Sequence, residues 1–140
     1  MAYEIRINPL DLQPNVAIGL DLPFDTSLGG GFKLNYTTLD QAVANSKNLL
    51  LTNKGERVML PTFGCDIQKS LFDNITDELV ATLDNNIRES FATWLPYIFI
   101  NELTITDDRD YNRLFIKLMI SLQDNKFETR PILVELNTAQ

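Results

Sequence analysis

The sequence predicts an α+β fold, with two main helices packed on an antiparallel β-meander of about three to four strands and an extended N-terminal arm. Apolar residues recur at helical spacing over residues 38–94 and alternate with other residues from position 98 onward. Before residue 37 neither period is sustained. We therefore expect an arm over residues 1–36 and one α+β domain over residues 37–140.

The arm is predicted from its proline and glycine residues. It holds three of the six prolines and the run Gly29–Gly31, which is typical of extended chain. Short apolar pieces, Val16–Ile18 and Leu20–Phe24, distinguish it from a solvated tail. These pieces fit two alternatives, packing on the chain's own core or lying on a partner.

Two long helices follow from capping residues and apolar spacing. The first is expected from about Thr38 to Thr52, with Thr37 or Thr38 as its cap. The second begins after Thr76 and ends before Pro96. Its apolar stripe consists of Val80, Leu83, Ile87, Phe91 and Trp94. This stripe is expected to face the core.

Between the helices, residues 55–72 mix turn formers with large apolar residues, which predicts a fixed, buried connection. A short helix over residues 67–72 fits the spacing, with Asp66 as its cap. Leu71 and Phe72 are then expected to turn inward.

After Pro96 the period becomes two, which predicts strands. In the first strand we expect Ile98, Ile100 and Glu102 on one face. The other face is expected to carry Phe99, Asn101, Leu103 and Ile105. The second strand covers residues 113–122, and a turn around residues 124–126 leads to a third with Ile132, Val134 and Leu136. Pro131 marks that last strand as an edge, because proline cannot donate a ladder hydrogen bond, and an edge can be offered to a neighbouring chain.

Composition limits the classes of function. The 140-residue chain is 44% hydrophobic and 22% charged, as in one globular domain. Its formal charge of -7 argues against a nucleic-acid partner, because phosphate binding needs clustered Lys and Arg. The sequence has neither a basic-then-apolar start nor 18 uninterrupted apolar residues, so we expect no membrane partner.

The residue types that most enzymes use are scarce. The chain has no histidine, which excludes histidine-based triads, and no nucleotide-binding or CxxC motif. The single cysteine, Cys65, indicates synthesis in a reducing compartment and is better explained as a buried side chain than as a nucleophile. We therefore expect no catalytic residue, cofactor or metal.

One catalytic alternative remains, a pair of carboxylates that would hydrolyse a glycosidic bond. The candidates are Glu56, Asp66, Asp77, Glu78, Glu89 and Glu102. Caps and first-turn charges already explain Asp66, Asp77 and Glu78, so we disfavour this alternative.

The connection carries a resemblance to a known family. After Lys54-Gly55-Glu56-Arg57 come Pro61, Phe63-Gly64-Cys65 and Leu71-Phe72. This pattern resembles the baseplate wedge proteins of contractile-tailed phages, whose relatives are baseplate subunits of type VI secretion systems. The resemblance covers about residue 38 to the carboxy terminus. The opening run carries Leu22-Pro23-Phe24, Gly29–Phe32 and Asn35-Tyr36-Thr37-Thr38. With these residues it resembles the arm of tail proteins from large myovirus-like phages.

Members of that family lie beside the inner tube and start polymerisation of the contractile sheath, whose subunits are linked by strand exchange. The resemblance implies that residues 98–136 mimic the linking domain of the sheath, with Ile132, Val134 and Leu136 as sheath-strand candidates. The family usually carries Glu-Pro-Arg between the last long helix and the first strand, where it contacts the wedge. Leu95, Pro96 and Tyr97 stand there, so an apolar wedge contact through Leu95 and Tyr97 is implied in place of a charged one.

These expectations define a structural subunit made in the host cytoplasm and present in several copies in the virion tail baseplate. Its expected partners are baseplate wedge proteins, the tail sheath protein and the inner tail tube. Two alternatives stay open: a peptidoglycan hydrolase, since some family members are labelled lysozyme-like, and a generic tail-tube or head-completion protein.

Overall fold

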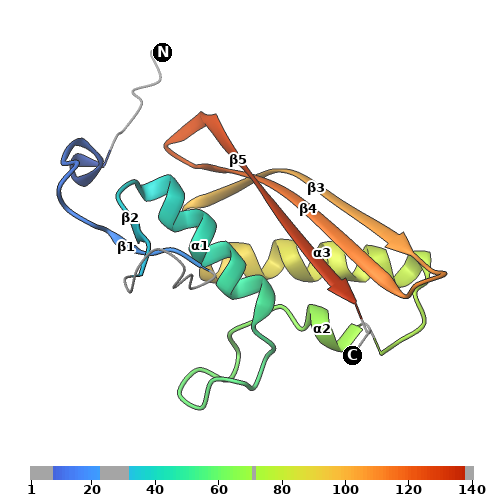
Figure 1. Cartoon of the computed structure of the whole chain (residues 1–140). Coiled ribbons are helices and arrows are strands. Elements are labelled where there is room, and N and C mark those ends of the chain that lie inside the picture. Colours follow the sequence, from blue (N-terminus) through green and yellow to red (C-terminus); the bar gives the residue numbers. More distant parts are fainter. Residues whose placement is uncertain (1–7, 23–31, 71, 138–140) are drawn as a thin grey trace.

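The computed structural model describes residues 8–22, 32–70 and 72–137. Its core elements are α1 (Thr38–Leu51), α2 (Ile67–Ser70), α3 (Asp77–Trp94), β3 (Ile98–Asp108), β4 (Arg113–Leu122) and β5 (Asn125–Asn137). A 3₁₀ helix (Pro9–Leu12) and two short strands, β1 (Gly19–Leu20) and β2 (Leu34–Asn35), precede them. The α+β prediction is confirmed (Figure 1).

Both long helices begin at the predicted caps. The Thr37 hydroxyl accepts from the Asp40 N–H, and the Thr76 hydroxyl accepts from the Leu79 N–H, both at 3.2 Å. Such caps satisfy N–H groups that have no partner within the helix.

The antiparallel sheet has the order β3-β4-β5, and α1 and α3 cover one of its faces (Figure 1). Alternate residues of β4 and β5 fill the core between the layers. They are Leu114, Ile116, Leu118, Ile120, Ile132, Val134 and Leu136. From α3, Leu83, Ile87 and Phe91 are buried as predicted, with Val80 and Trp94 partly so.

The predicted alternation along β3 is wrong beyond Ile100. A bulge places Asn101 between the pairs formed by Ile100 and Glu102, and its side chain accepts from the Ser121 hydroxyl at 2.7 Å. The extra residue shifts the face on which later side chains lie. Leu103 and Ile105 therefore pack against the core, on the same side as Ile98 and Ile100, and not opposite them.

The described part of the arm is less extended than predicted, since it forms the 3₁₀ helix and pairs β1 with β2. Both pieces are tied to α1: the Asp11 carboxylate accepts from the Thr38 N–H at 2.9 Å, and Lys47 Nζ donates to the Leu22 carbonyl at 3.2 Å. Val16 remains exposed. The run Gly29–Gly31 and residues 23–24 of the apolar piece lie outside the described residues.

Candidate functional site

The outer edge of β5 is the edge predicted to receive another strand. The hydrogen bonds of β4 show which backbone groups of β5 point toward that edge. Directly after β4, the Gln123 N–H donates to the Tyr97 carbonyl at 2.9 Å, which continues the β3–β4 ladder. Backbone groups alternate between the two sides of a strand. Odd-numbered residues of β4 therefore bond to β3, and even-numbered ones bond to β5.

This assignment fixes which residues of β5 face outward. The even-numbered β4 residues stand opposite Ile132, Val134 and Leu136. Pro131, opposite Met119, consequently directs its nitrogen away from the sheet, the position that proline tolerates. The backbone groups of Leu133 and Glu135 also point away from β4. Each residue therefore presents one N–H and one carbonyl at the open edge.

The three sheath-strand candidates are therefore not the residues whose backbone groups lie at the open edge. Ile132, Val134 and Leu136 lie in β5, but their backbone bonds to β4 and their side chains are buried in the core. The outward residues that sequence reasoning missed are Leu133, 73% exposed, and Glu135. Pro131 was the sequence signal for them. Because the nitrogen of a proline in an edge strand points away from the sheet, the other odd-numbered residues of β5 point the same way.

A groove of about 550 Å³ runs between this edge and the last turns of α1. It is lined by Leu22, Lys47, Asn48, Leu51, Leu133, Val134 and Glu135. Toward Pro131 a smaller hollow of about 300 Å³ lies between β5 and the β1–β2 pair, and Lys47 lines both. The edge thus has an apolar recess beside it.

The junction between α3 and β3 holds the wedge candidates. Leu95 is only 8% exposed, and its N–H donates to the Phe91 carbonyl at 2.9 Å. Pro96 and Tyr97 are exposed, and the Tyr97 hydroxyl accepts from Asn45 Nδ2 at 2.8 Å. A contact made here would use Pro96 and Tyr97, because Leu95 is already packed.

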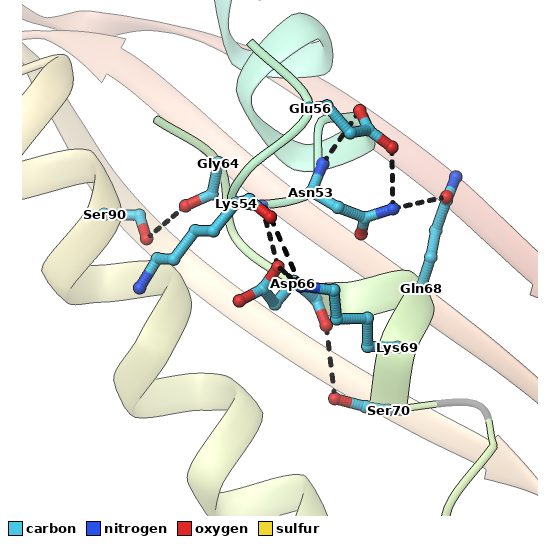
Figure 2. A network of polar contacts seen from close by, with 9 residues as sticks. All are labelled: Asn53, Lys54, Glu56, Gly64, Asp66, Gln68, Lys69, Ser70 and Ser90. Carbon is cyan, nitrogen blue, oxygen red and sulfur yellow. Dashed lines mark hydrogen bonds and ion pairs between the residues drawn. The ribbon is translucent and has the colours of Figure 1, made fainter. Parts of the chain in front are cut away.

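The connection from α1 to α2 is a loop held by backbone hydrogen bonds and a close approach at Gly64. Gly55 and Gly64 have positive φ angles of 91° and 131°, and the Gly55 N–H donates to the Pro61 carbonyl at 2.7 Å. A Cβ on Gly64 would lie 2.4 Å from the Thr52 carbonyl oxygen, so this position needs glycine. The Ser90 hydroxyl of α3 donates to the Gly64 carbonyl at 3.3 Å (Figure 2).

Three sequence predictions for this loop are wrong. The connection is not buried throughout, since residues 54–62 are exposed. Asp66 has a φ of 54°, and its carboxylate accepts from the Lys54 N–H at 2.7 Å and pairs with Lys69 at 3.0 Å, so it ties α2 back to the loop (Figure 2). The expected cap is thus a cross-link. Phe72 is 87% exposed and does not turn inward, because α2 already ends at Ser70. Leu71 lies outside the described residues.

The tip of the loop is apolar and faces solvent. Val58 and Met59 are each 92% exposed, and Leu60 is partly so. Beneath the tip, Arg57 stacks 4.2 Å above the ring of Phe63, which contacts Trp94 edge-on at 5.4 Å. Large apolar side chains held out on a fixed base are typical of an interaction surface. The apolar triplet inside a turn-rich segment was its sequence signal.

The side chains considered for catalysis are not gathered into one site. Cys65 is buried as predicted, and burial raises the pKa of its thiol. A third hollow of about 900 Å³ lies between the 3₁₀ helix, the start of α1 and the turn from β4 to β5. None of the six acidic candidates lines this hollow or the two beside β5. Asp66 pairs with Lys69, and Asp77 pairs with Arg109 at 2.6 Å. In the described ranges of the chain, no group of three potential metal ligands occurs, and no helix is long and apolar enough to span a bilayer.

Comparison with known proteins identifies the family. The model of the family described as baseplate wedge protein gp25 matches residues 37–126, which include both long helices, the loop, β3 and β4 and end at the start of β5. The chain belongs to this baseplate wedge protein family. The resemblance carried by the loop motif is thereby confirmed, and the protein is a component of the virion tail baseplate.

The relatives extend this result. Baseplate wedge protein gp25 of Enterobacteria phage T4 is 30% identical over 91 residues, 63% of this chain and 67% of that protein. A proposed tail lysozyme from Geobacter sulfurreducens shares the fold with a TM-score of 0.61 and 23% identity, over 71% of this chain and 90% of that one. A chain of the anti-feeding prophage baseplate does so with a TM-score of 0.55 and 22% identity, over 86% and 85% of the two chains.

Proposed function

We propose that this baseplate wedge protein starts assembly of the contractile sheath by offering the open edge of β5 to a strand of the first sheath ring. The observation that carries the proposal is the free backbone of Leu133 and Glu135 in a stretch that pairs with β4 without interruption from Thr129 to Asn137. An added strand would form hydrogen bonds to these four groups. At about 0.5–1.5 kcal/mol each, they would contribute about 2–6 kcal/mol.

Leu133→Pro tests the mechanism, because proline removes one outward N–H while the ladder to β4 stays intact. Baseplates assembled with this variant are expected to carry tubes but start no sheaths in electron micrographs. Leu133→Ala is the matched control: it removes the exposed side chain, keeps the N–H, and should start sheaths far more often than Leu133→Pro. Sheaths that form at wild-type frequency on a folded Leu133→Pro protein would rule out strand addition at this edge.

Deleting residues 131–140, which would be the simplest test from the sequence, is not suitable. That deletion removes Ile132, Val134 and Leu136 from the core. A missing sheath would then report unfolding, because each lost core side chain costs about 2–5 kcal/mol.

For the rest of the wedge we propose two contacts, the apolar tip at Val58–Leu60 and the exposed pair Pro96 and Tyr97. Met59→Asp is expected to weaken copurification with wedge subunits and leave the melting temperature unchanged, since Met59 touches little of its own chain. Leu12→Asp, at another exposed apolar position, is the control. Recovery of a tube or head protein in place of wedge subunits would favour a tail-tube or head-completion role.

We propose that the protein has no hydrolase activity. The likeness to a proposed tail lysozyme is a likeness of fold at 23% identity, and the six acidic candidates are spread over the α1–α2 loop, α3 and β3. The purified protein is therefore expected not to clear a suspension of peptidoglycan. Clearing that a single Glu or Asp substitution abolishes would establish the enzyme.

A further inference from the structure

The groove beside β5 limits which strands can dock at this edge, because a side chain of the docking strand would enter the groove. Directly opposite residues of paired strands direct their side chains to the same face of the sheet. A residue of an added strand opposite Val134 would therefore point toward the helices, as Val134 does. At this point the sheet has no further strand, and the groove lined by Leu22, Leu51 and Val134 lies open.

The lining of the groove indicates what would enter it. Leu51, in the last turn of α1, is 47% exposed although it adjoins the core helix face. The Lys47 ammonium donates to the carbonyl of Leu22, another lining residue, at 3.2 Å, so this charge already has a partner within the lining. The floor formed by Leu22, Leu51 and Val134 is apolar, beside the polar side chains of Asn48 and Glu135. Burying a large apolar side chain against this floor stabilises a complex far more than a polar one would.

Pro131 limits the edge at one end. It lacks the N–H that an added strand would accept from, while its carbonyl remains available. From this carbonyl to Asn137 the edge extends over seven residues, about 20 Å at the rise of a strand. The hollow at Pro131 is walled by Asp21 and Lys33, an ion pair at 2.8 Å. The recess therefore changes from polar to apolar along the edge.

We propose that the edge takes an extended strand of the sheath subunit with a large apolar residue opposite Val134, and that this residue fills the groove while the backbone pairs at Leu133 and Glu135. This inference rests on the proposed function and adds the register and the side-chain pattern of the partner strand. Glu135, half exposed on the outer face, favours a basic residue opposite it.

Leu51→Asp tests the groove, because it puts a charge on the floor without changing the backbone of β5. Baseplates carrying Leu51→Asp are expected to start about tenfold fewer sheaths than the wild type, whereas Leu12→Asp, outside the groove, should have no effect. Both variants should keep the wild-type melting temperature. If Leu51→Asp lowers it, Leu51→Gln is a milder substitution that keeps nearly the same length and is expected to reduce sheath formation in the same direction.

A photo-crosslinking amino acid at position 51 identifies the occupant in assembled particles. The expected adduct is an extended sheath segment with a large apolar residue at the linked position, and none at position 12. Normal sheath formation by Leu51→Asp, with Leu133→Pro still inactive, would overturn the groove and leave strand addition standing. Normal sheath formation by Leu133→Pro, or an adduct to a wedge subunit alone, would overturn both.

Discussion

The two edges of the sheet differ in how ready they are to accept another strand. Along β5, pairing with β4 continues without a break from Thr129 to Asn137. Along β3, the bulge at Asn101 divides the edge into two shorter pieces. Bulges are a common way to protect edges from unwanted pairing. The comparison indicates that a bulge interrupts the β3 edge after Ile100, whereas the β5 edge is continuous over nine residues.

A second difference lies beside the edges. A groove adjoins β5, formed with α1 and the residues of the arm near Leu22. Neither of the other two hollows described above is lined by β3. An added strand at β5 would gain both backbone and side-chain contacts, so affinity and selectivity would arise at the same place.

The largest expected effect is a difference in stability between proline substitutions at two neighbouring positions of β5, one bonded to β4 and one at the open edge. Val134→Pro removes a ladder bond to β4 and the packing of a buried side chain, so the free energy of unfolding should fall by about 3–4 kcal/mol. Leu133→Pro should lower it by less than about 1 kcal/mol. Urea denaturation of both variants measures the difference, and equal losses would show that the assigned backbone direction is wrong.

The next effect concerns the bulged edge of β3. Deleting Asn101 would straighten β3 and keep Ile98, Ile100, Leu103 and Ile105 on one face. The bond from Ser121 would be lost, at a cost of about 1 kcal/mol, and the straightened edge should make the protein associate with itself. Sedimentation velocity across a concentration series would show the dimer, and Asn101→Ala, which keeps the bulge residue, serves as control. A deletion variant that stays monomeric would remove the protective role of the bulge.

A smaller effect is expected from the outer face of the β5 edge. The Glu135 carboxylate lies 3.9 Å from the Arg113 guanidinium, and both side chains are largely exposed. Glu135→Lys should therefore change the free energy of unfolding by less than about 0.5 kcal/mol. Sheath formation should nevertheless fall by about two- to fivefold if a basic residue lies opposite. Glu135→Gln should lie between the two, and an unchanged frequency for both variants would argue against that basic residue.

The smallest effect is a pH dependence of the hollow at Pro131. A hydrogen bond from Lys33 holds the pKa of the Asp21 carboxyl below its usual value. A depressed pKa means that the stabilisation is present at neutral pH and is lost as the pH falls through the folded-state pKa, which lies below that of an ordinary aspartate. The carboxyl chemical shift of Asp21, followed by NMR, should show a lower titration midpoint in the wild type than in the Lys33→Ala variant. Identical midpoints would exclude the ion pair in solution.

Local signals were enough for the helices and for the pattern of β4. Thr37 and Thr76 act within three residues of their partners, and every second residue of β4 faces the core irrespective of its neighbours. The loop motif likewise depends on Gly55 and Gly64, whose backbone angles few other residues adopt. These features are encoded by residues close together in the chain.

Other features depended on distant partners. The bulge at Asn101 follows from pairing with Ser121, twenty residues away, and the carboxylate of Asp66 bonds to Lys54 because the loop folds back. Phe72 has the composition of a core residue, yet it is exposed. A residue type alone does not specify which surface another segment already occupies.

The sequence by itself determined the two long helices, the three strands after them, their order and the presence of an edge at Pro131, because caps, periodicity and a missing N–H act locally. Only the tertiary structure decided that Leu133 and Glu135 form that edge and that a groove lies beside it. The direction of a backbone group and the distance between a strand and a helix arise from the packing of segments that are remote in sequence. Strand addition depends on those two quantities.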